Sequence, residues 1–283
     1  MIFDSHTHIQ FKAFDEDRTE VIDRAIEHNV LMNVVGTQSS TSKAAVLLAE
    51  KHKNIYASVG IHPIQHDVVD VVEETTEFTS RGELWNQELF EELAKHPKVI
   101  AIGETGLDRF HIRKDKTIEE IFNKQKELFK KHYDLAKAYT LPLVIHVRDA
   151  HEETLAILEA LHKQDGDING TIHCFSGNWQ EAQRYLALGL HLGFTGIITF
   201  PVKKTNPQVQ LDLLEVVEKM PIEKMLLETD APYLTPQVRR GKRNEPMLVH
   251  AVAEKVAEVR NMSVEEVITQ TTRNGKKLFN KMV

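Results

Sequence analysis

Short apolar runs alternate with longer amphipathic segments along the whole chain. The runs are rich in Val, Ile and Leu and lack a regular polar alternation, which is typical of strands buried on both faces of a parallel sheet. Between the runs, apolar residues recur at the spacing of a helix with one buried face. The pattern predicts eight strands, at residues 2–5, 31–36, 55–60, 98–103, 141–146, 170–173, 190–194 and 225–229.

At least one predicted helix follows each predicted strand. The helical segments are residues 16–28, 43–52, 83–95, 117–139, 150–163, 178–188, 207–219, 245–260 and 263–280. Two of them begin on the spacing of a capping box, Thr117 with Glu120 and Ser263 with Glu266. The acidic segment 67–80 is the best candidate for a surface excursion.

Eight strand–helix units in a chain of this length predict a (β/α)8 TIM barrel, with residues 1–283 forming a single domain. The alternative is an open doubly wound sheet, which usually concentrates its chemistry after a Gly-rich turn that follows the first strand. Here the first strand runs into histidines, and the chain has no GxGxxG motif. Candidate functional residues instead follow several strands, and only a barrel brings all strand ends onto one face.

Composition narrows the classes of protein that are possible. Cys174 is the one cysteine, so a disulfide framework is excluded and we expect a reducing, cytoplasmic location. We expect no signal peptide and no membrane partner, because the sequence has neither a basic–apolar leader nor an apolar run of about 18 residues. The net charge of −7 argues against a protein that coats nucleic acid, but it allows a local basic patch.

Possible metal ligands stand at the ends of the predicted strands. His6 and His8 are two residues apart, so their side chains share one face of an extended strand. Other apolar runs end in further candidates, namely Glu104, His146, His173, Asp230 and His62. Each of these residues alone also fits a polar turn or a satisfied core histidine. Since a barrel gathers its strand ends, the set together favours a metal site, in which Glu104 is a candidate bridging carboxylate.

Neighbouring residues are expected to have structural roles. Asp108 is expected to be structural, and Glu228, which shares a face with Asp230, is expected to be a hydrogen-bonded interior carboxylate. Cys174 should face away from His173 and pack. The remaining histidines are predicted to lie on surface helices, among them His52, His96 and His250.

Positive side chains near the candidate ligands could bind an anionic substrate. Arg148 can share the face of His146, and its planar guanidinium suits phosphate, although an ion pair with Asp149 is the alternative. The densest positive cluster comes about ten residues after Asp230 and consists of Arg239, Arg240, Lys242 and Arg243. A short basic run of this kind fits a phosphate-contacting loop or an ordinary solvated loop.

The assembled motifs resemble the TatD family of metal-dependent hydrolases, described chiefly as deoxyribonucleases on an amidohydrolase-like (β/α)8 barrel. The resemblance runs from residue 1 to Phe279 and rests on motifs in family order: His6-Thr7-His8, Gly60-Ile61-His62-Pro63, Gly103-Glu104-Thr105-Gly106-Leu107-Asp108, Ile145-His146-Val147-Arg148-Asp149-Ala150, His173-Cys174-Phe175-Ser176-Gly177, Glu228-Thr229-Asp230-Ala231-Pro232-Tyr233-Leu234 and Arg243-Asn244-Glu245-Pro246. It implies a site for two divalent ions, with His6, His8, Glu104, His146, His173 and Asp230 as ligands. It also implies that His62 lies near the substrate.

Two departures from the family pattern lie near the expected mouth of the site. The segment between His62 and Glu104 is longer than usual, and Arg109-Phe110 stands where an aromatic pair is common. Both put the substrate preference in question, while leaving the expected ligand set intact.

The expected chemistry is hydrolysis of a phosphodiester in DNA, at single strands or duplex ends, and the resemblance implies a 3′–5′ exonuclease. Asp230 would act as the base for the attacking water and Glu104 would bridge the ions. His62, Arg148, Arg239, Arg240 and Arg243 would hold phosphate charge. Imidazole and carboxylate ligands suit Zn²⁺ or Mn²⁺, and the resemblance keeps Mg²⁺ open.

Two other functions remain open from the sequence. One is an amide or lactone hydrolase of the wider amidohydrolase group. Many of those enzymes end strand four in a lysine that becomes carbamylated to bridge the metals, and Glu104 at that place counts against this hypothesis. The other is a metal-binding protein without enzymatic activity, which the full set of six ligand candidates disfavours. The sequence leaves the oligomeric state open.

Overall fold

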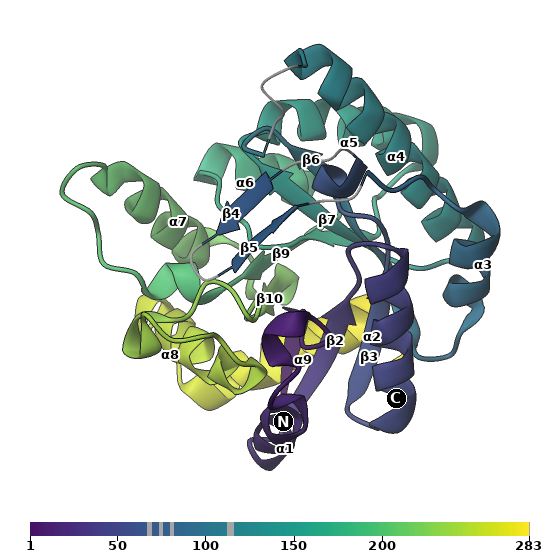
Figure 1. The fold of residues 1–283 in the computed structure, drawn as a ribbon. Coiled ribbons are helices and arrows are strands. Elements are labelled where there is room, and N and C mark those ends of the chain that lie inside the picture. The colour runs from purple at the N-terminus through teal and green to yellow at the C-terminus, as the bar shows by residue number, and fades with distance from the viewer. Residues whose placement is uncertain (67–69, 74–75, 80–81, 112–115, 283) are drawn as a thin grey trace.

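The computed structural model describes residues 1–66, 70–73, 76–79, 82–111 and 116–282. Eight parallel strands form a nearly closed barrel with helices around it (Figure 1). The strands, in their order around the barrel, are β1 (Ile2–Thr7), β2 (Val30–Val35), β3 (Ile55–Val59), β6 (Val99–Asp108), β7 (Leu143–Arg148), β8 (Gly170–Ile172), β9 (His191–Phe194) and β10 (Met225–Leu227). The predicted barrel and its eight strands are confirmed.

The first and last barrel strands meet where the barrel closes. Thr7 bridges to Ala231 in parallel, the Asp230 N–H donates to the His6 carbonyl at 2.9 Å, and the His8 N–H donates to the Ala231 carbonyl at 2.7 Å. Deeper in the barrel, two residues before His6 on β1, the buried Asp4 carboxylate accepts hydrogen bonds from the Thr229 N–H and hydroxyl at 2.8 and 2.6 Å. Closure therefore places the His6–His8 pair beside Asp230.

The helices are α1 (Arg18–Glu27), α2 (Ser39–Lys51), α3 (Gln87–Lys95), α4 (Ile118–Tyr139), α5 (His151–Asp165), α6 (Trp179–Ala187), α7 (Pro207–Lys219), α8 (Val249–Arg260) and α9 (Val264–Leu278). Both predicted capping boxes are confirmed, at Thr117 with Glu120 and at Ser263 with Glu266. The helix predicted from residue 245 begins at Val249, because Pro246–Leu248 forms a separate 3-10 turn. No helix among the described residues is long and apolar enough to span a bilayer.

The predicted surface excursion at residues 67–80 contains a small sheet of its own. Strands β4 (Asp70–Glu73) and β5 (Thr76–Thr79) pair antiparallel in a two-stranded sheet that is separate from the barrel sheet. Residues 67–69, 74–75 and 80 of the predicted segment lie outside the described residues. The hairpin interrupts the connection between β3 and α3.

The barrel strands are buried along almost their whole length, as a parallel sheet covered by helices requires. Large apolar side chains fill the interior and the layer beneath the helices. Hydrogen bonds from buried polar side chains link neighbouring strands: Asn33 donates to the Ser5 carbonyl at 3.0 Å, and the Ser58 hydroxyl donates to Asn33 at 2.9 Å. This closed core leaves the carboxyl ends of the strands as the place for chemistry.

Candidate metal centre

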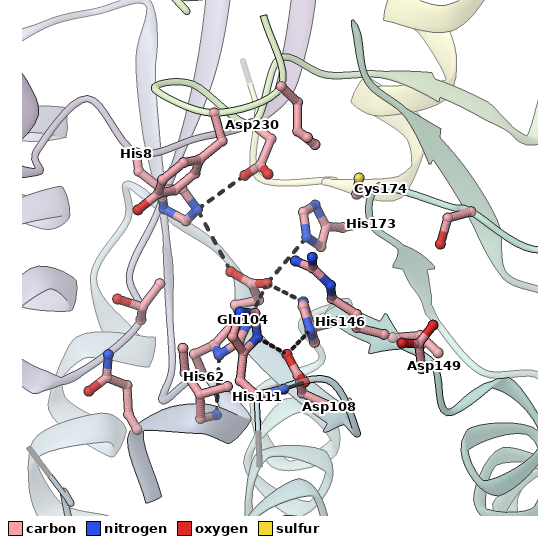
Figure 2. A pocket seen from close by; sticks show the side chains of 18 of the residues that line it. His8, His62, Glu104, Asp108, His111, His146, Asp149, His173, Cys174 and Asp230 are labelled. Atoms are coloured by element: carbon pink, nitrogen blue, oxygen red, sulfur yellow. Dashed lines mark hydrogen bonds and ion pairs between the residues drawn. The ribbon is translucent and has the colours of Figure 1, made fainter. Parts of the chain in front are cut away.

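A cavity of about 320 Å³ opens at the carboxyl ends of the strands (Figure 2). Its lining draws on the ends of β1, β3, β6, β7, β8 and β10 and includes His8, His62, Glu104, His146, Arg148, His173 and Asp230. His6 is fully buried but lies only 3.4 Å from Glu104. The structure thus brings together all six predicted metal ligands, with His62 and Arg148 beside them.

Glu104 occupies the centre of this group (Figure 2). On one side, its Oε2 atom lies 3.4 Å from His6 Nε2 and 3.8 Å from His8 Nε2. On the other side, its Oε1 atom lies 3.0 Å from His146 Nδ1 and 3.2 Å from His173 Nε2. One buried carboxylate therefore presents its two oxygens to two separate pairs of imidazoles.

Two glycines of β6 let Glu104 approach the neighbouring strand. Gly103 and Gly106 both have φ of +149°, a conformation that side chains strongly disfavour. A Cβ atom at Gly103 would overlap the Val144 carbonyl, and one at Gly106 would overlap the His146 carbonyl. The Gly-Glu-Thr-Gly sequence therefore sets Glu104 directly beside the end of β7.

The side chains around Glu104 Oε2 supply nitrogen and oxygen atoms of the kinds that bind a divalent ion. His6 Nε2 and His8 Nε2 are 3.1 Å apart, and Asp230 Oδ1 lies 3.8 and 3.4 Å from them. Ligands at about 2.0–2.2 Å from one ion in a tetrahedron stand about 3.3–3.6 Å apart, so these spacings fit a shared ion. His8 Nδ1 donates to the Val35 carbonyl at 2.7 Å, which leaves the Nε2 lone pair free to bind a metal.

The Oε1 side repeats this arrangement with carboxylates behind the histidines. His146 directs Nε2 to Asp108 Oδ2 at 3.1 Å and Nδ1 to Glu104. His173 directs Nδ1 to Glu228 Oε1 at 3.3 Å and Nε2 to Glu104. A carboxylate behind an imidazole fixes its tautomer and makes the facing nitrogen a better ligand. Groups of three from these residues, His62 among them, could each hold an ion.

Asp108 and Glu228 were predicted as structural carboxylates, and their hydrogen bonds are confirmed. Asp108 also accepts from the His111 N–H at 2.8 Å and from its ring Nδ1 at 2.9 Å, while Glu228 accepts from the Ser5 hydroxyl at 3.1 Å and from the Cys174 N–H. The sequence interpretation missed their place behind the ligands. It also assigned His111 to a surface helix with the other remaining histidines, which was wrong, because the His111 ring lines the cavity beside Asp108.

The two inner carboxylates are held in their charged form. Burial would raise the pKa of Glu104, but the surrounding histidines, His62 and His173 foremost, outweigh it and hold the pKa well below its usual range. For Asp230, burial again acts to raise the pKa, while the hydrogen bond from His8 and the nearby histidine charges lower it. Both groups are therefore anionic at neutral pH, as metal ligands must be.

The histidines divide into two classes. Burial lowers the pKa of His6, and it lowers the pKa of His62 to about 4. Burial opposes charge at His146 and His173 as well, but the adjacent carboxylates prevail: they raise the pKa of His146 to about 9 and that of His173 well above its usual value. The site thus attracts positive charge, and its mixture of imidazole and carboxylate fits a divalent transition metal.

Ion binding at neutral pH should release protons. A raised pKa means that His146 and His173 are positively charged at pH 7 in the metal-free protein, with protons on both ring nitrogens. An ion must displace one proton from each ring to bind. Metal affinity should therefore rise from pH 6 to about 9, the pKa of His146. Calorimetric titration with Zn²⁺ or Mn²⁺ in two buffers of different ionisation enthalpy measures the released protons. Identical heats in both buffers would contradict the prediction.

The predicted substrate-binding arginines lie at different depths. Arg148 lines the cavity, and its guanidinium lies 4.3 Å from the centroid of the Phe110 ring. Arg239, Arg240 and Arg243 are not among the described residues that line the cavity. Arg239 is exposed, and Arg240 stacks 4.0 Å from the centroid of the Phe200 ring.

Arg243 is engaged within the fold. Its guanidinium donates to Asp17 Oδ2 at 2.6 Å and to the Ala13 carbonyl at 2.5 Å, and it lies over the Phe14 ring. These contacts fasten the segment after β10 to the segment after β1. A phosphate contact from Arg243 remains a prediction, and it would compete with the bond to Asp17.

Two further histidines assigned to surface helices were placed wrongly. His191 is buried on strand β9. His132 is fully buried, because it lies on the same inner face of α4 as Leu128 and Leu135. Its Nε2 atom accepts from the Ile61 N–H at 2.9 Å, and its Nδ1 donates to the Leu128 carbonyl at 2.8 Å. His132 therefore supports the turn that carries His62.

Comparisons with known proteins agree with this geometry. The sequence model of a family described as "TatD related DNase" matches residues 3–280. The Bacillus subtilis protein named "Uncharacterized metal-dependent hydrolase YabD" is 40% identical over 99% of both chains. The Shigella flexneri protein named "3'-5' ssDNA/RNA exonuclease TatD" is 32% identical over 98% of both. The crystal structure of YjjV, a TatD homologue of Escherichia coli, superposes with a TM-score of 0.80 at 28% identity, covering 99% of this chain and 98% of that one.

Proposed function

Because the chain belongs to the TatD related DNase family and is a metal-dependent hydrolase, we propose that it hydrolyses phosphodiester bonds in DNA as a 3′–5′ exonuclease. The observation that carries the proposal is the buried Glu104 carboxylate between two sets of imidazoles, at the base of a cavity with Arg148 in its wall. The relative named as a 3'-5' ssDNA/RNA exonuclease supports the polarity and the single-stranded substrate.

The site is proposed to hold two divalent ions. One would be held by His6, His8, Asp230 and Glu104 Oε2, and the other by His146, His173 and Glu104 Oε1. Two such ions lower the pKa of water and stabilise the attacking and leaving oxygens of a phosphodiester. The nitrogen-rich ligand set favours Zn²⁺ or Mn²⁺ over Mg²⁺, which the family resemblance keeps as a third candidate.

Other side chains in and around the cavity are proposed to have separate roles in the reaction. Asp230 is ionised at neutral pH and would accept the proton of the attacking water through Oδ1. Arg148 would place its planar fork against the non-bridging oxygens of the scissile phosphate. Arg239 and Arg240, which are exposed outside the cavity, would contact flanking phosphates of the strand.

An amide or lactone hydrolase on the same barrel is the alternative that an assay must exclude. The deciding experiment offers the protein, loaded separately with Zn²⁺, Mn²⁺ and Mg²⁺, a short DNA strand labelled at its 5′ end, a duplex with the same ends, and a panel of amides and lactones. We expect ladders of products shortened from the 3′ end. Fast turnover of an amide or lactone with intact DNA would overturn the proposal.

A cytoplasmic location is part of the proposal. It is supported by the single thiol of Cys174, which has no disulfide partner in the chain. Localisation of a fluorescently tagged protein would test it.

Replacing Arg148 should have a different kinetic effect from replacing the outer arginines. Arg148→Ala should lower kcat by about 10- to 10²-fold, because its contact strengthens as charge develops on the phosphoryl oxygens. Arg239→Gln/Arg240→Gln should mainly raise KM, and the removal of each phosphate-binding charge should flatten the salt dependence by about 0.7 in slope on a single strand. Steady-state kinetics at several salt concentrations measure both effects.

The control for the outer pair is Lys130→Gln/Lys131→Gln, which removes the same charge from the outer side of α4. This control should leave KM and the salt slope close to wild type. The proposed division of labour would be refuted if the control changed the slope as much as the arginine pair did, or if Arg148→Ala hydrolysed DNA at the wild-type rate.

A further inference from the structure

We infer that His62 is a neutral hydrogen-bond donor that presents its Nε2–H to a phosphoryl oxygen of the substrate, and that it is neither a metal ligand nor a cation. The inference rests on the proposed function for the identity of its acceptor. It changes the role of a residue that has the same reach toward Glu104 as the ligand histidines: His62 Nε2 lies 3.3 Å from Glu104 Oε1, and its ring centroid lies 4.2 Å from that of His146.

The backbone behind the ring decides the tautomer. The Ile64 N–H points at His62 Nδ1, with 3.2 Å between the two nitrogens. A peptide N–H can only donate, so Nδ1 must carry a lone pair. In a neutral imidazole the proton then resides on Nε2, the nitrogen that faces the cavity. A proton on Nδ1 would set two N–H groups against each other, so the same contact disfavours the imidazolium.

Three of the four ligand histidines have the opposite environment. His8 meets a carbonyl oxygen with its outer nitrogen, and His146 and His173 meet carboxylates with theirs. All three facing groups can only accept a hydrogen bond, so the outer nitrogen of each ring keeps its proton and the inner one is the nitrogen that can bind an ion. His62 differs because its outer nitrogen accepts. Its inner nitrogen therefore has no lone pair to offer a metal.

The segment around His62 is fixed by hydrogen bonds, so the ring keeps its position relative to the Ile64 N–H. The His62 N–H donates to the Thr37 carbonyl at 2.9 Å, and the His62 carbonyl accepts from the Gln65 N–H at 2.9 Å. The preceding Ile61 N–H donates to the buried His132 ring at 2.9 Å. These bonds fix the turn after β3 from both sides and hold the ring over Glu104.

A fixed neutral donor suits the reaction. His62, Glu104 and Arg148 line the same cavity, and in the inferred arrangement a phosphate held by Arg148 lies against the His62 Nε2–H. A positive imidazole here would repel the ions that the surrounding residues are built to hold, whereas a neutral N–H adds a directed bond without that repulsion. Because charge grows on the non-bridging oxygens during cleavage, the bond should strengthen in the transition state.

The first test measures which nitrogens of the His62 ring carry a proton. Protein labelled with ¹⁵N-histidine is compared with its His62→Gln variant to assign the signals, at pH 7, without metal and with Zn²⁺. We expect His62 to show a proton-bearing Nε2 and a lone-pair-bearing Nδ1 in both states. A doubly protonated ring without metal, or loss of the Nε2 proton when Zn²⁺ is added, would overturn the inference. This result does not depend on whether DNA is the substrate.

The second test separates donor, ligand and cation by function. His62→Ala should lower kcat on a short DNA strand by about 10²-fold, the usual cost of one removed transition-state donor, and His62→Gln should recover part of it through its amide N–H. Zn²⁺ stoichiometry and affinity by calorimetry should stay within about twofold of wild type, and the salt slope should not change. His146→Ala serves as the ligand control and should lose Zn²⁺ affinity.

The outcomes distinguish this inference from the function on which it rests. A drop in Zn²⁺ affinity in His62→Ala that matches the His146→Ala control would make His62 a ligand. A flatter salt slope in His62→Ala would make it a cation. If wild-type protein hydrolyses no DNA, the proposed function fails, and the ¹⁵N signals and metal titrations alone still confirm or refute the neutral, non-ligand state of His62.

Discussion

Removal of divalent metal from the purified protein is expected to abolish hydrolysis and to leave the barrel folded. The expectation follows from where the ligands lie: all six stand at the carboxyl ends of the strands, while the apolar core extends through the barrel and beneath the helices. A core of this size does not need a metal to form. Chelation followed by dialysis, with metal content verified, gives the protein to assay.

The fold is followed by circular dichroism and thermal unfolding of the same samples. Metal that binds only the native state should raise the melting temperature by roughly 5–10 °C at a hundredfold excess over Kd, since about 2.7 kcal/mol is added. Returning Zn²⁺ or Mn²⁺ should restore activity without a refolding step. Full activity in verified metal-free protein would refute the proposed chemistry, and unfolding upon chelation would refute the separation of site from core.

The six ligand candidates could be predicted from the sequence because of topology. Parallel strands that are buried on both faces appear in the sequence as uninterrupted apolar runs, so the residue at which each strand ends can be identified. A barrel brings these strand ends together on one face. His146 and His173 needed no more than this to be placed together. The glycines around Glu104 also indicated a close approach, which the structure locates at the carbonyls of β7.

The polar partners behind the ligands could not be predicted in the same way. The clamp between Asp4 and Thr229 depends on the register at which β10 closes on β1, and two distant segments do not reveal that register. The tautomer of His62 depends on one N–H group, that of Ile64. Such contacts are set by backbone direction to within a fraction of an ångström, and residue types alone do not encode it.

The density of positive residues was the least informative feature of the sequence for predicting phosphate contacts. The basic run after Asp230 is dense, yet Arg243 is bound by Asp17, which stands far away in the sequence, and Arg240 lies on Phe200. The arginines therefore differ in how free they are to meet a phosphate. His132 shows a similar limit: it was assigned to a surface helix with the other remaining histidines, whereas it lies buried on the inner face of α4.

Replacement of Asp230 by Asn should cost at least about 10²-fold in kcat, or about 2.7 kcal/mol of transition-state stabilisation. The substitution keeps the size of the side chain and one oxygen that can face an ion. It removes the negative charge and the capacity to accept a proton. Burial acts to raise the pKa of Asp230, but the hydrogen bond from His8 and the nearby histidine charges lower it. The wild-type carboxylate is therefore ionised at neutral pH and can accept a proton.

A loss of activity in Asp230→Asn has two possible causes, because the same oxygen lies 3.4 Å from His8 Nε2 and belongs to a ligand set. Metal analysis and calorimetry of the variant separate them. If Asp230 is the base, a metal-replete variant stays slow, and its residual rate climbs with pH as hydroxide replaces the missing acceptor. Excess Zn²⁺ or Mn²⁺ that restores turnover would instead make Asp230 only a ligand.

The matched control is Asp167→Asn, the same chemical change on a side chain that is 82% exposed in the segment before β8, at the opposite end of the barrel. It should hydrolyse DNA at the wild-type rate and bind the same amount of metal. Unchanged turnover in metal-replete Asp230→Asn would remove Asp230 as the base. The other described carboxylates at the centre, Glu104, Asp108 and Glu228, each already face histidines, so the proton would then have to leave through solvent at the mouth of the cavity.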